Sequence, residues 1–179
     1  TAHTLYRIGS EGMELKNEVT NNSGLETIAR VGQSFRLPAA FDALTWYGKG
    51  PWETYADRKD AALIGLYTSS VAEQHVPFAV PCECGGHEDT RFAALSDGTH
   101  IVQIVGSDDF HFSALPYSIA EYRKATYEEE LPEQTTGTWL ILDVAHAGLG
   151  GDTGWTKNIH PEYRVCKGRY SYTFRFHFA

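Results

Sequence analysis

The sequence predicts an all-β protein, specifically an antiparallel β-sandwich. The clearest evidence is the segment 170–178, in which aromatic residues alternate with Ser, Thr, Arg and His, as they do in a strand with one buried face. Residues 13–19 alternate in the same way over a shorter stretch. Turn-forming residues separate the apolar segments, at 21–24, 48–51, 85–86, 96–98 and 148–154. Many short strands with such spacing are typical of a sandwich or a barrel.

The individual elements follow from the same patterns. Strands are predicted at 13–19, 26–37, 61–68, 99–106, 109–115, 138–145 and 170–178. One short helix is predicted over 118–128, because Ser118 followed by Glu121 forms a capping box and apolar residues then recur with helical spacing. Leu131-Pro132 must lie beyond this helix, since a residue before proline disfavours the helical conformation.

Length and charge narrow the class of protein. A chain of 179 residues predicts one domain, 1–179. Its 15 basic and 23 acidic residues give a net charge of −8, which argues against nucleic acid and anionic membrane as partners. No run approaches the ~18 apolar residues of a membrane span, and the first residues lack the pattern of a signal peptide. We therefore expect a soluble protein, either cytoplasmic or periplasmic.

Two further features concern the chain as a whole. Its three cysteines, Cys82, Cys84 and Cys166, are an odd number, so a disulfide scaffold is not expected. The chain starts at Thr1 and passes almost directly into strand-like sequence, so we expect a C-terminal piece of a larger multidomain protein.

Residues 48–58 combine glycines and a proline with three charged side chains, Glu53, Asp57 and Arg58. Two carboxylates could serve acid and base chemistry, as they do in glycosidases. A structural ion network is the simpler interpretation, because Arg58 directly follows Asp57 and lies close to Glu53 in sequence.

Residues 82–87 bring together two thiols, a carboxylate and an imidazole, which are all ligand types for zinc. The spacing is poor for a structural zinc site, and Cys166 has no partner near it in sequence, so no metal is expected. Asp143 and His146 suggest an orienting pair for a nucleophile, but no serine has a suitable setting. His146 is therefore interpreted as a hydrogen-bonded structural residue.

The segment 145–155 is glycine-rich and follows a strong predicted strand. Glycine allows the backbone to adopt positive φ and lets another surface approach closely. Asp152 can accept hydrogen bonds from loop amides, and Trp155 has little beside it in sequence to pack on. An indole exposed on such a loop can stack on the apolar face of a sugar ring. The alternative is that Trp155 turns into the core.

The chain resembles the small C-terminal domain of β-galactosidases of glycoside hydrolase family 2. Three motifs occur in the family's order: Gly48-x-Gly50-Pro51-x-Glu53-x-Tyr55-x-Asp57-Arg58, then Gly137-Thr138-Trp139 with Asp143, then Gly150-Gly151-Asp152-x-x-Trp155. Segments 78–85 and 112–117 are also similar, so the resemblance extends from about Arg30 to Phe178. Three positions depart from the family pattern, namely Cys84, His87 and Gly154.

The resemblance implies a galactose-mutarotase-like sandwich packed on a catalytic TIM barrel elsewhere in the parent chain. It places the two catalytic glutamates on that barrel, so no residue here is expected to be catalytic and the isolated chain is expected to be inactive. Trp155 corresponds to a tryptophan that stacks on the aglycone sugar of the β-galactoside, with Gly150, Gly151, Asp152 and His146 shaping its loop. The parent is expected to be a homo-oligomer, with magnesium and sodium bound outside this domain.

Two other functions stay open. The chain could be a free-standing carbohydrate-binding module or an enzyme like an aldose 1-epimerase, with His111, His146 and Glu53 as possible acid and base. It could also be a purely architectural sandwich whose exposed sheet edge docks on a neighbouring domain.

Overall fold

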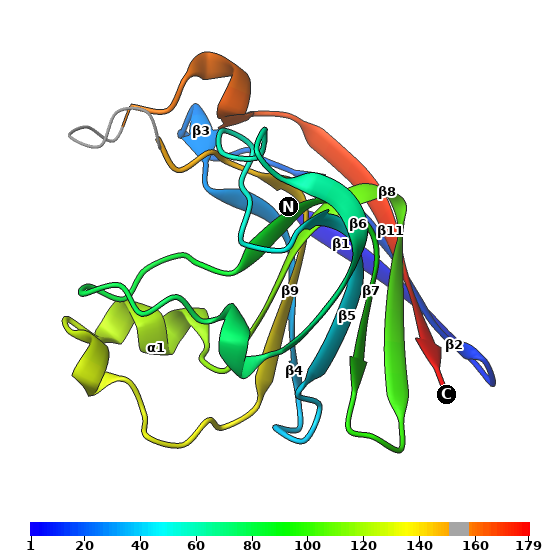
Figure 1. Ribbon diagram of the computed structural model, residues 1–179. Helices are drawn as coiled ribbons and strands as arrows, with labels where there is room; N and C mark the ends of the chain where they lie inside the picture. Colours follow the sequence, from blue (N-terminus) through cyan, green and yellow to red (C-terminus); the bar gives the residue numbers. More distant parts are fainter. Residues whose placement is uncertain (151–157) are drawn as a thin grey trace.

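The computed structural model describes residues 1–150 and 158–179, and Figure 1 shows curved antiparallel strands with one short helix to the side. The all-β prediction is confirmed. The strands are β1 (Ala2–Gly9), β2 (Gly12–Thr20), β3 (Thr27–Ile28), β4 (Arg30–Leu37), β5 (Ala43–Gly50), β6 (Leu63–Ser70), β7 (Gly86–Ser96), β8 (Ile101–Leu115), β9 (Thr138–His146), β10 (Val165–Cys166) and β11 (Arg169–Phe178). The helices are α1 (Ile119–Lys124) and three short 3-10 helices at Ala72–Gln74, Glu128–Glu130 and Pro161–Tyr163.

The main sheet branches at the long strand β8. One continuous path runs in the order β1-β2-β11-β8-β7-β5-β6. The first part of β8, from Val102 to Gly106, pairs with β11, whereas its last part, from His111 to Leu115, pairs with β9. Strand β9 in turn pairs with β4. Because β7 occupies the other edge of β8 along its length, β11 and β9 share one edge at different heights, and the sheet divides there into two layers.

The two layers face each other across an aromatic and aliphatic core. The rings of Phe35 on β4 and Phe176 on β11 have centroids 5.0 Å apart, although these two strands do not pair. Asn17 of β2 likewise donates to the side chain of Gln33 on β4. This contact between unpaired strands is the sandwich packing that the sequence predicts. The largest fully buried core side chains include Leu15, Trp46, Ile104, Phe112, Leu140 and Phe174.

Several strand boundaries differ from the prediction. The segments predicted as 99–106 and 109–115 form the single strand β8, because the polar residues between them are exposed without interrupting it. The predicted strand 26–37 is divided into β3 and β4, which pair with different partners, β10 and β9. Residues 48–50, predicted as part of a turn, complete β5, since Gly48 packs against Thr90 closely enough to exclude a Cβ atom. Strands β1, β5 and β7 are absent from the predicted set, because their alternation is interrupted by glycine and charged residues. Strand β10 is also absent, because its two residues are too short to show a pattern.

Helix α1 begins at the predicted capping box. The Ser118 hydroxyl accepts from the Glu121 N–H, and the Glu121 carboxylate accepts from the Ser118 N–H at 2.6 Å. The helix ends at Lys124, short of the predicted residue 128, because Ala125 has an extended backbone. The Thr126 N–H then donates to the Glu130 carboxylate, which stabilises a separate turn. Buried Tyr122 packs the helix against Leu115 and Leu131 in a second, smaller apolar cluster.

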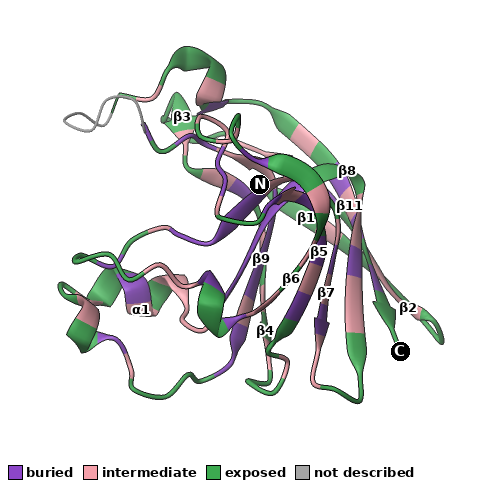
Figure 2. Cartoon of the chain, in the orientation of Figure 1, coloured by how far each residue is buried: buried purple, intermediate pink, exposed green. Residues whose placement is uncertain are grey.

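Figure 2 shows that burial is concentrated in the central strands, whereas the outer strands of the sheet are largely exposed. Within the described residues, no helix has the length and apolar character needed to cross a membrane. The three cysteines are free thiols, of which only Cys84 is buried.

Candidate functional site

Buried charges gather where β4 and β9 lie side by side. Arg30 begins β4 and pairs in register with His146, the last residue of β9. Its guanidinium donates to Asp143 at 2.6 and 3.0 Å and to Glu83 at 3.0 Å. The Asp143 side chain is only 1 % exposed. A carboxylate this deeply buried requires a cationic partner, and Arg30 provides it.

Two histidines stack directly beside these charges. The rings of His111 on β8 and His146 on β9 have centroids 4.4 Å apart and lie nearly parallel. Nδ1 of His111 lies 2.8 Å from the Glu88 carboxylate, and Nδ1 of His146 lies 2.7 Å from the carbonyl oxygen of Ala147. The buried ring of Tyr55 packs against both histidines, with centroids 5.4 Å from each. The side chains are therefore fixed in place by neighbours.

The surroundings shift the pKa values of three of these groups, Glu83, Arg30 and Tyr55. Burial alone would raise the pKa of Glu83, but neighbouring His146 and Arg30 lower it below its usual value, so the carboxylate is charged. Burial also lowers the pKa of Arg30, but Asp143 and Glu83 outweigh that effect and raise it overall. Burial raises the pKa of Tyr55, with Glu83 and Glu53 adding to the effect, so this phenol stays neutral.

The segment 48–58 forms the wall beside these residues. Glu53 accepts a hydrogen bond from the Gly85 N–H at 2.8 Å and forms an ion pair with Arg58. The Tyr55 hydroxyl accepts from the Gly86 N–H at 3.3 Å. Pro51 follows Gly50 through a cis peptide bond, and Gly50 packs against the rings of Tyr67 and Trp46. Glu53 is thus engaged by the loop before β7 and does not join the two histidines.

Asp57 connects the segment 48–58 to the glycine-rich loop, although they are about 90 residues apart in sequence. Its carboxylate accepts from the N–H of Leu149 at 3.0 Å and from the N–H of Gly150 at 2.6 Å. Gly148 approaches so closely that a Cβ atom there would lie 2.6 Å from the carboxylate carbon. The start of the glycine-rich loop is therefore fixed by Asp57.

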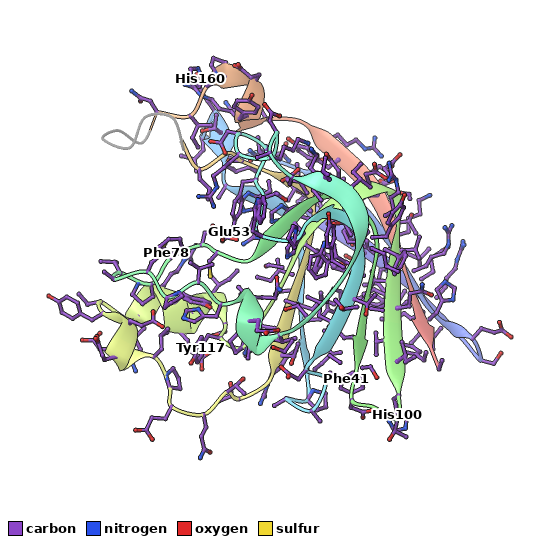
Figure 3. All side chains as sticks on the ribbon, in the orientation of Figure 1. Phe41, Glu53, Phe78, His100, Tyr117 and His160 are labelled. Carbon is purple, nitrogen blue, oxygen red and sulfur yellow. The ribbon has the colours of Figure 1, made fainter. Side chains whose placement is uncertain are left out.

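A cavity of about 490 Å³ opens beside this loop. Its lining includes Glu83 and His146 together with Leu149 and Asn158, the last two of which lie near either end of the segment 151–157. The predicted site residues Gly151, Asp152 and Trp155 lie outside the described residues. Figure 3 places Glu53 on this side of the molecule, at the far end of the sheet from His100.

Within the segment 82–87, His87 and Cys84 have separate structural roles. Fully buried His87 lies 2.6 Å from the side-chain oxygen of Gln74 and 3.2 Å from the carbonyl oxygen of Lys49. Burial lowers the pKa of His87 to about 3, so the ring is neutral. The Cys84 thiol instead contacts the Tyr122 hydroxyl at 3.7 Å.

Sequence reasoning did not associate Arg30, Glu83 and Glu88 with the histidines. These residues come from separate segments, and only strand pairing brings them together. Nothing in the spacing of Glu83, His111 and His146 indicates that they meet.

Comparisons with known proteins identify the family. Residues 1–176 match the model of the family described as "Beta galactosidase small chain". The chain is 38 % identical to a beta-galactosidase of Vibrio cholerae serotype O1 over 93 % of its length, and 36 % identical to a beta-galactosidase of Priestia megaterium over 96 %. It is 40 % identical to beta-galactosidase 2 of Enterobacter cloacae over 95 %.

In each of these relatives the matched region is a small part of the protein. The chain spans 16 % of the length of all three. A solved structure of a candidate aldose 1-epimerase from Escherichia coli K12 is also similar, with a TM-score of 0.48 and 8 % identity, covering 98 % of this chain and 59 % of that one. At this level of similarity the structural match adds nothing about activity. The sequence matches over nearly the whole chain show that the protein belongs to the beta galactosidase small chain family.

Proposed function

We propose that this chain acts within a β-galactosidase, completing the substrate pocket while another domain cleaves the glycosidic bond. The observation that supports it most is the match of residues 1–176 to the small-chain family, combined with relatives that are about six times longer, since the chain is 16 % of each. The reaction is hydrolysis of terminal β-D-galactose residues with retention. Two glutamates on a TIM barrel supply acid/base and nucleophile, as the family resemblance implies.

In this proposal Trp155 stacks its indole on the aglycone sugar. Support comes from the way the loop is held: Asp57 binds the amides of Leu149 and Gly150, so the loop leaves a fixed point on the cavity rim. A rigid base lowers the entropy lost when an aromatic side chain is positioned against a ligand. The proposal assigns Gly151 and Asp152 to shaping this loop, and His146 lies in the cavity wall.

The outer strands suit the chain to a larger protein. Leu5 and Ile8 on β1 and Leu63 and Leu66 on β6 are all more than half exposed. Within the described residues, β1 pairs only with β2 and β6 only with β5, so both strands leave one edge unpaired. Such apolar edges are suitable surfaces for the remaining domains of a homo-oligomeric parent. In this proposal, the magnesium and sodium ions of the parent bind to those other domains.

The test is Trp155→Ala in the full-length parent enzyme. Loss of one stacking face should weaken aglycone binding by roughly 1–3 kcal/mol, by analogy with base stacking on aromatic side chains. The measurement is the inhibition constant of glucose as aglycone analogue, with Trp155→Phe as the variant that keeps an aromatic face. Unchanged inhibition in Trp155→Ala would remove Trp155 from the pocket. Turnover of a nitrophenyl galactoside by the isolated chain, in proportion to its concentration, would contradict the division of labour.

A second candidate, aldose epimerisation, is favoured by one observation. His111 and His146 stack beside Glu83, and Glu83 and His146 line the cavity of about 490 Å³, which is a suitable setting for acid and base groups. Glu53, the carboxylate predicted for this role, pairs with Arg58 instead. Polarimetry on freshly dissolved α-galactose tests it: acceleration by the chain that is lost in His146→Gln supports epimerisation, and the buffer rate rejects it.

A further inference from the structure

Three potential metal ligands converge from three separate segments. Glu83 precedes β7, His111 lies on β8 and His146 ends β9. One ligand atom from each lies within 4.8 Å of the other two, and Nε2 of His146 is 3.6 Å from Oε1 of Glu83. Metal–ligand bonds of ~2.1 Å in tetrahedral geometry place neighbouring ligand atoms about 3.4 Å apart. The Glu83–His146 pair already has that spacing. Because the rings of His111 and His146 are stacked at an interplanar angle of 22°, the His111 ring must tilt to direct its nitrogen at the same ion.

The hydrogen bonds of the two histidines engage Nδ1 of each ring and leave Nε2. Nδ1 of His111 faces the Glu88 carboxylate, and Nδ1 of His146 faces the carbonyl oxygen of Ala147. Both partners can only accept, so Nδ1 of each ring carries a proton. Nε2 of each ring is then the nitrogen that can bind a metal ion. Zinc-bound histidines are oriented in the same way, by a carboxylate or carbonyl oxygen at the other ring nitrogen.

No protein donor among the described residues satisfies two of these ligand atoms. Nε2 of His111 and Oε1 of Glu83 are each buried and have no hydrogen-bond partner, and the His111 side chain is 2 % exposed. Leaving such atoms unpaired costs about 1–3 kcal/mol each. Two unpaired acceptors next to Nε2 of His146 are an arrangement that a cation satisfies.

The surrounding charge also favours a cation. The ion pairs around the ligands join four carboxylates, those of Glu83, Glu88, Asp89 and Asp143, to two cationic side chains, Arg30 and Lys59. The adjoining cavities are also lined by the charged residues Glu26, Asp109, Glu162 and Arg164. Arg30 takes the other oxygen of Glu83, Oε2, so Oε1 stays available. Apart from the two imidazoles, the six side chains of these ion pairs sum to two excess negative charges, which a divalent ion would neutralise.

We propose that Glu83, His111 and His146 bind one divalent transition-metal ion, with zinc preferred. Two imidazoles and one carboxylate are a ligand set that zinc uses, with a fourth position left for water. Two cavities give access: Glu83 and His146 line the one of about 490 Å³, and His111 and His146 line a second of about 350 Å³. The proposed metal site shares His146 and the larger cavity with the proposed substrate pocket, but it does not require Trp155.

The experiment titrates the 179-residue chain, freed of metal by chelation, with Co²⁺ and then with Zn²⁺ against a chromophoric chelator. We expect one ion per chain, with visible Co²⁺ absorption that Zn²⁺ displaces. His146→Gln and Glu83→Gln should lower the affinity at least ~100-fold, because even loss of an outer hydrogen-bonding partner costs 10–100-fold. Glu88→Gln removes the carboxylate that faces Nδ1 of His111, so it should lower the affinity by about 10–100-fold. His100→Gln, on an exposed histidine at the far end of the sheet, is the matched control.

Several results would overturn the site. The first is that the wild-type chain shows no visible Co²⁺ absorption, and the second is that folded His146→Gln binds the ion with unchanged affinity. The third is that a Cys82→Ser, Cys166→Ser double variant loses binding, which would show that the thiols hold the ion. If the site variants fail to fold by circular dichroism, ¹⁵N spectra of the wild-type histidine rings decide. Zinc must then shift Nε2 of His111 and His146 while Nδ1 stays protonated. A shared proton or a water molecule in place of the metal would leave these resonances unchanged.

Discussion

The two halves of β8 differ in how they are buried. From Ile101 to Gly106 the strand is mostly half-buried, and it pairs with β11. From Phe110 to Leu115 every residue is buried, and the strand pairs with β9. A strand covered on both faces encloses its polar side chains, and His111 is one of them. The comparison teaches that the candidate site arises where the sandwich branches and a polar face becomes interior.

The largest effect is expected from removing a charge beside the fully buried half of β8, where the chain's stability should depend on it. Arg30→Met should destabilise the chain by about 3–5 kcal/mol, because it leaves Asp143 buried without its cation. Urea unfolding followed by far-ultraviolet circular dichroism measures it. Arg175→Met is the matched control: Arg175 lies opposite Val105 in the other half, and its pair with Glu14 is exposed. There we expect at most about 1 kcal/mol. Equal losses in the two variants would show that the halves do not differ energetically.

A smaller effect compares two aspartates that each bind a pair of backbone amides. Asp57→Ala should cost about 1.5–3 kcal/mol, since it removes charge-assisted bonds to the amides of Leu149 and Gly150. Hydrogen exchange of these two amides should accelerate. Asp97 does the same for Thr99 and His100 in the exposed turn before β8, and Asp97→Ala should leave the Leu149 and Gly150 amides protected. Unchanged exchange in Asp57→Ala would mean that other contacts hold the loop.

The smallest effect is the change in unfolding free energy for each pH unit, which depends on His87. His87, opposite Phe112 in the buried half, has a pKa lowered by burial to about 3, against 6.5 for an unperturbed histidine. The unfolded chain therefore binds a proton that the folded chain does not, and stability falls as the pH drops from 6.5 toward 3. The slope is about 1.4 kcal/mol per pH unit for one proton. Between pH 6.5 and 4.5, the unfolding free energy of the wild-type chain should fall more steeply with falling pH than that of the His87→Gln variant. The His100→Gln variant should show the same slope as the wild-type chain.

The fold was largely predictable because its evidence is local. Strand β11 alternates with period two, and the capping box at Ser118 and Glu121 marks the start of α1. Strand β7 escaped prediction because His87, Glu88 and Asp89 look like a surface segment, whereas a bulge there buries His87 and directs Glu88 to His111. Polarity alone does not show which polar side chains an adjacent layer covers.

The candidate site was predictable only in parts. The family motifs identified segments 48–58 and 145–155, but the bond from Asp57 to Gly150 joins residues whose proximity depends on the whole sheet. The same holds for Glu83 and His111, which were considered in separate contexts. Trp155 stays a prediction, because it lies outside the described residues.

The outer strands β1 and β6 have a practical consequence for work on the isolated chain. Each offers an unpaired edge together with large aliphatic side chains, such as Ile8 at 80 % and Leu63 at 75 % exposure. Strands of this kind add to one another in solution. Purified alone, the chain is therefore expected to self-associate as its concentration rises. Dilute samples, or a lysine introduced on β1 or β6, would keep it monomeric.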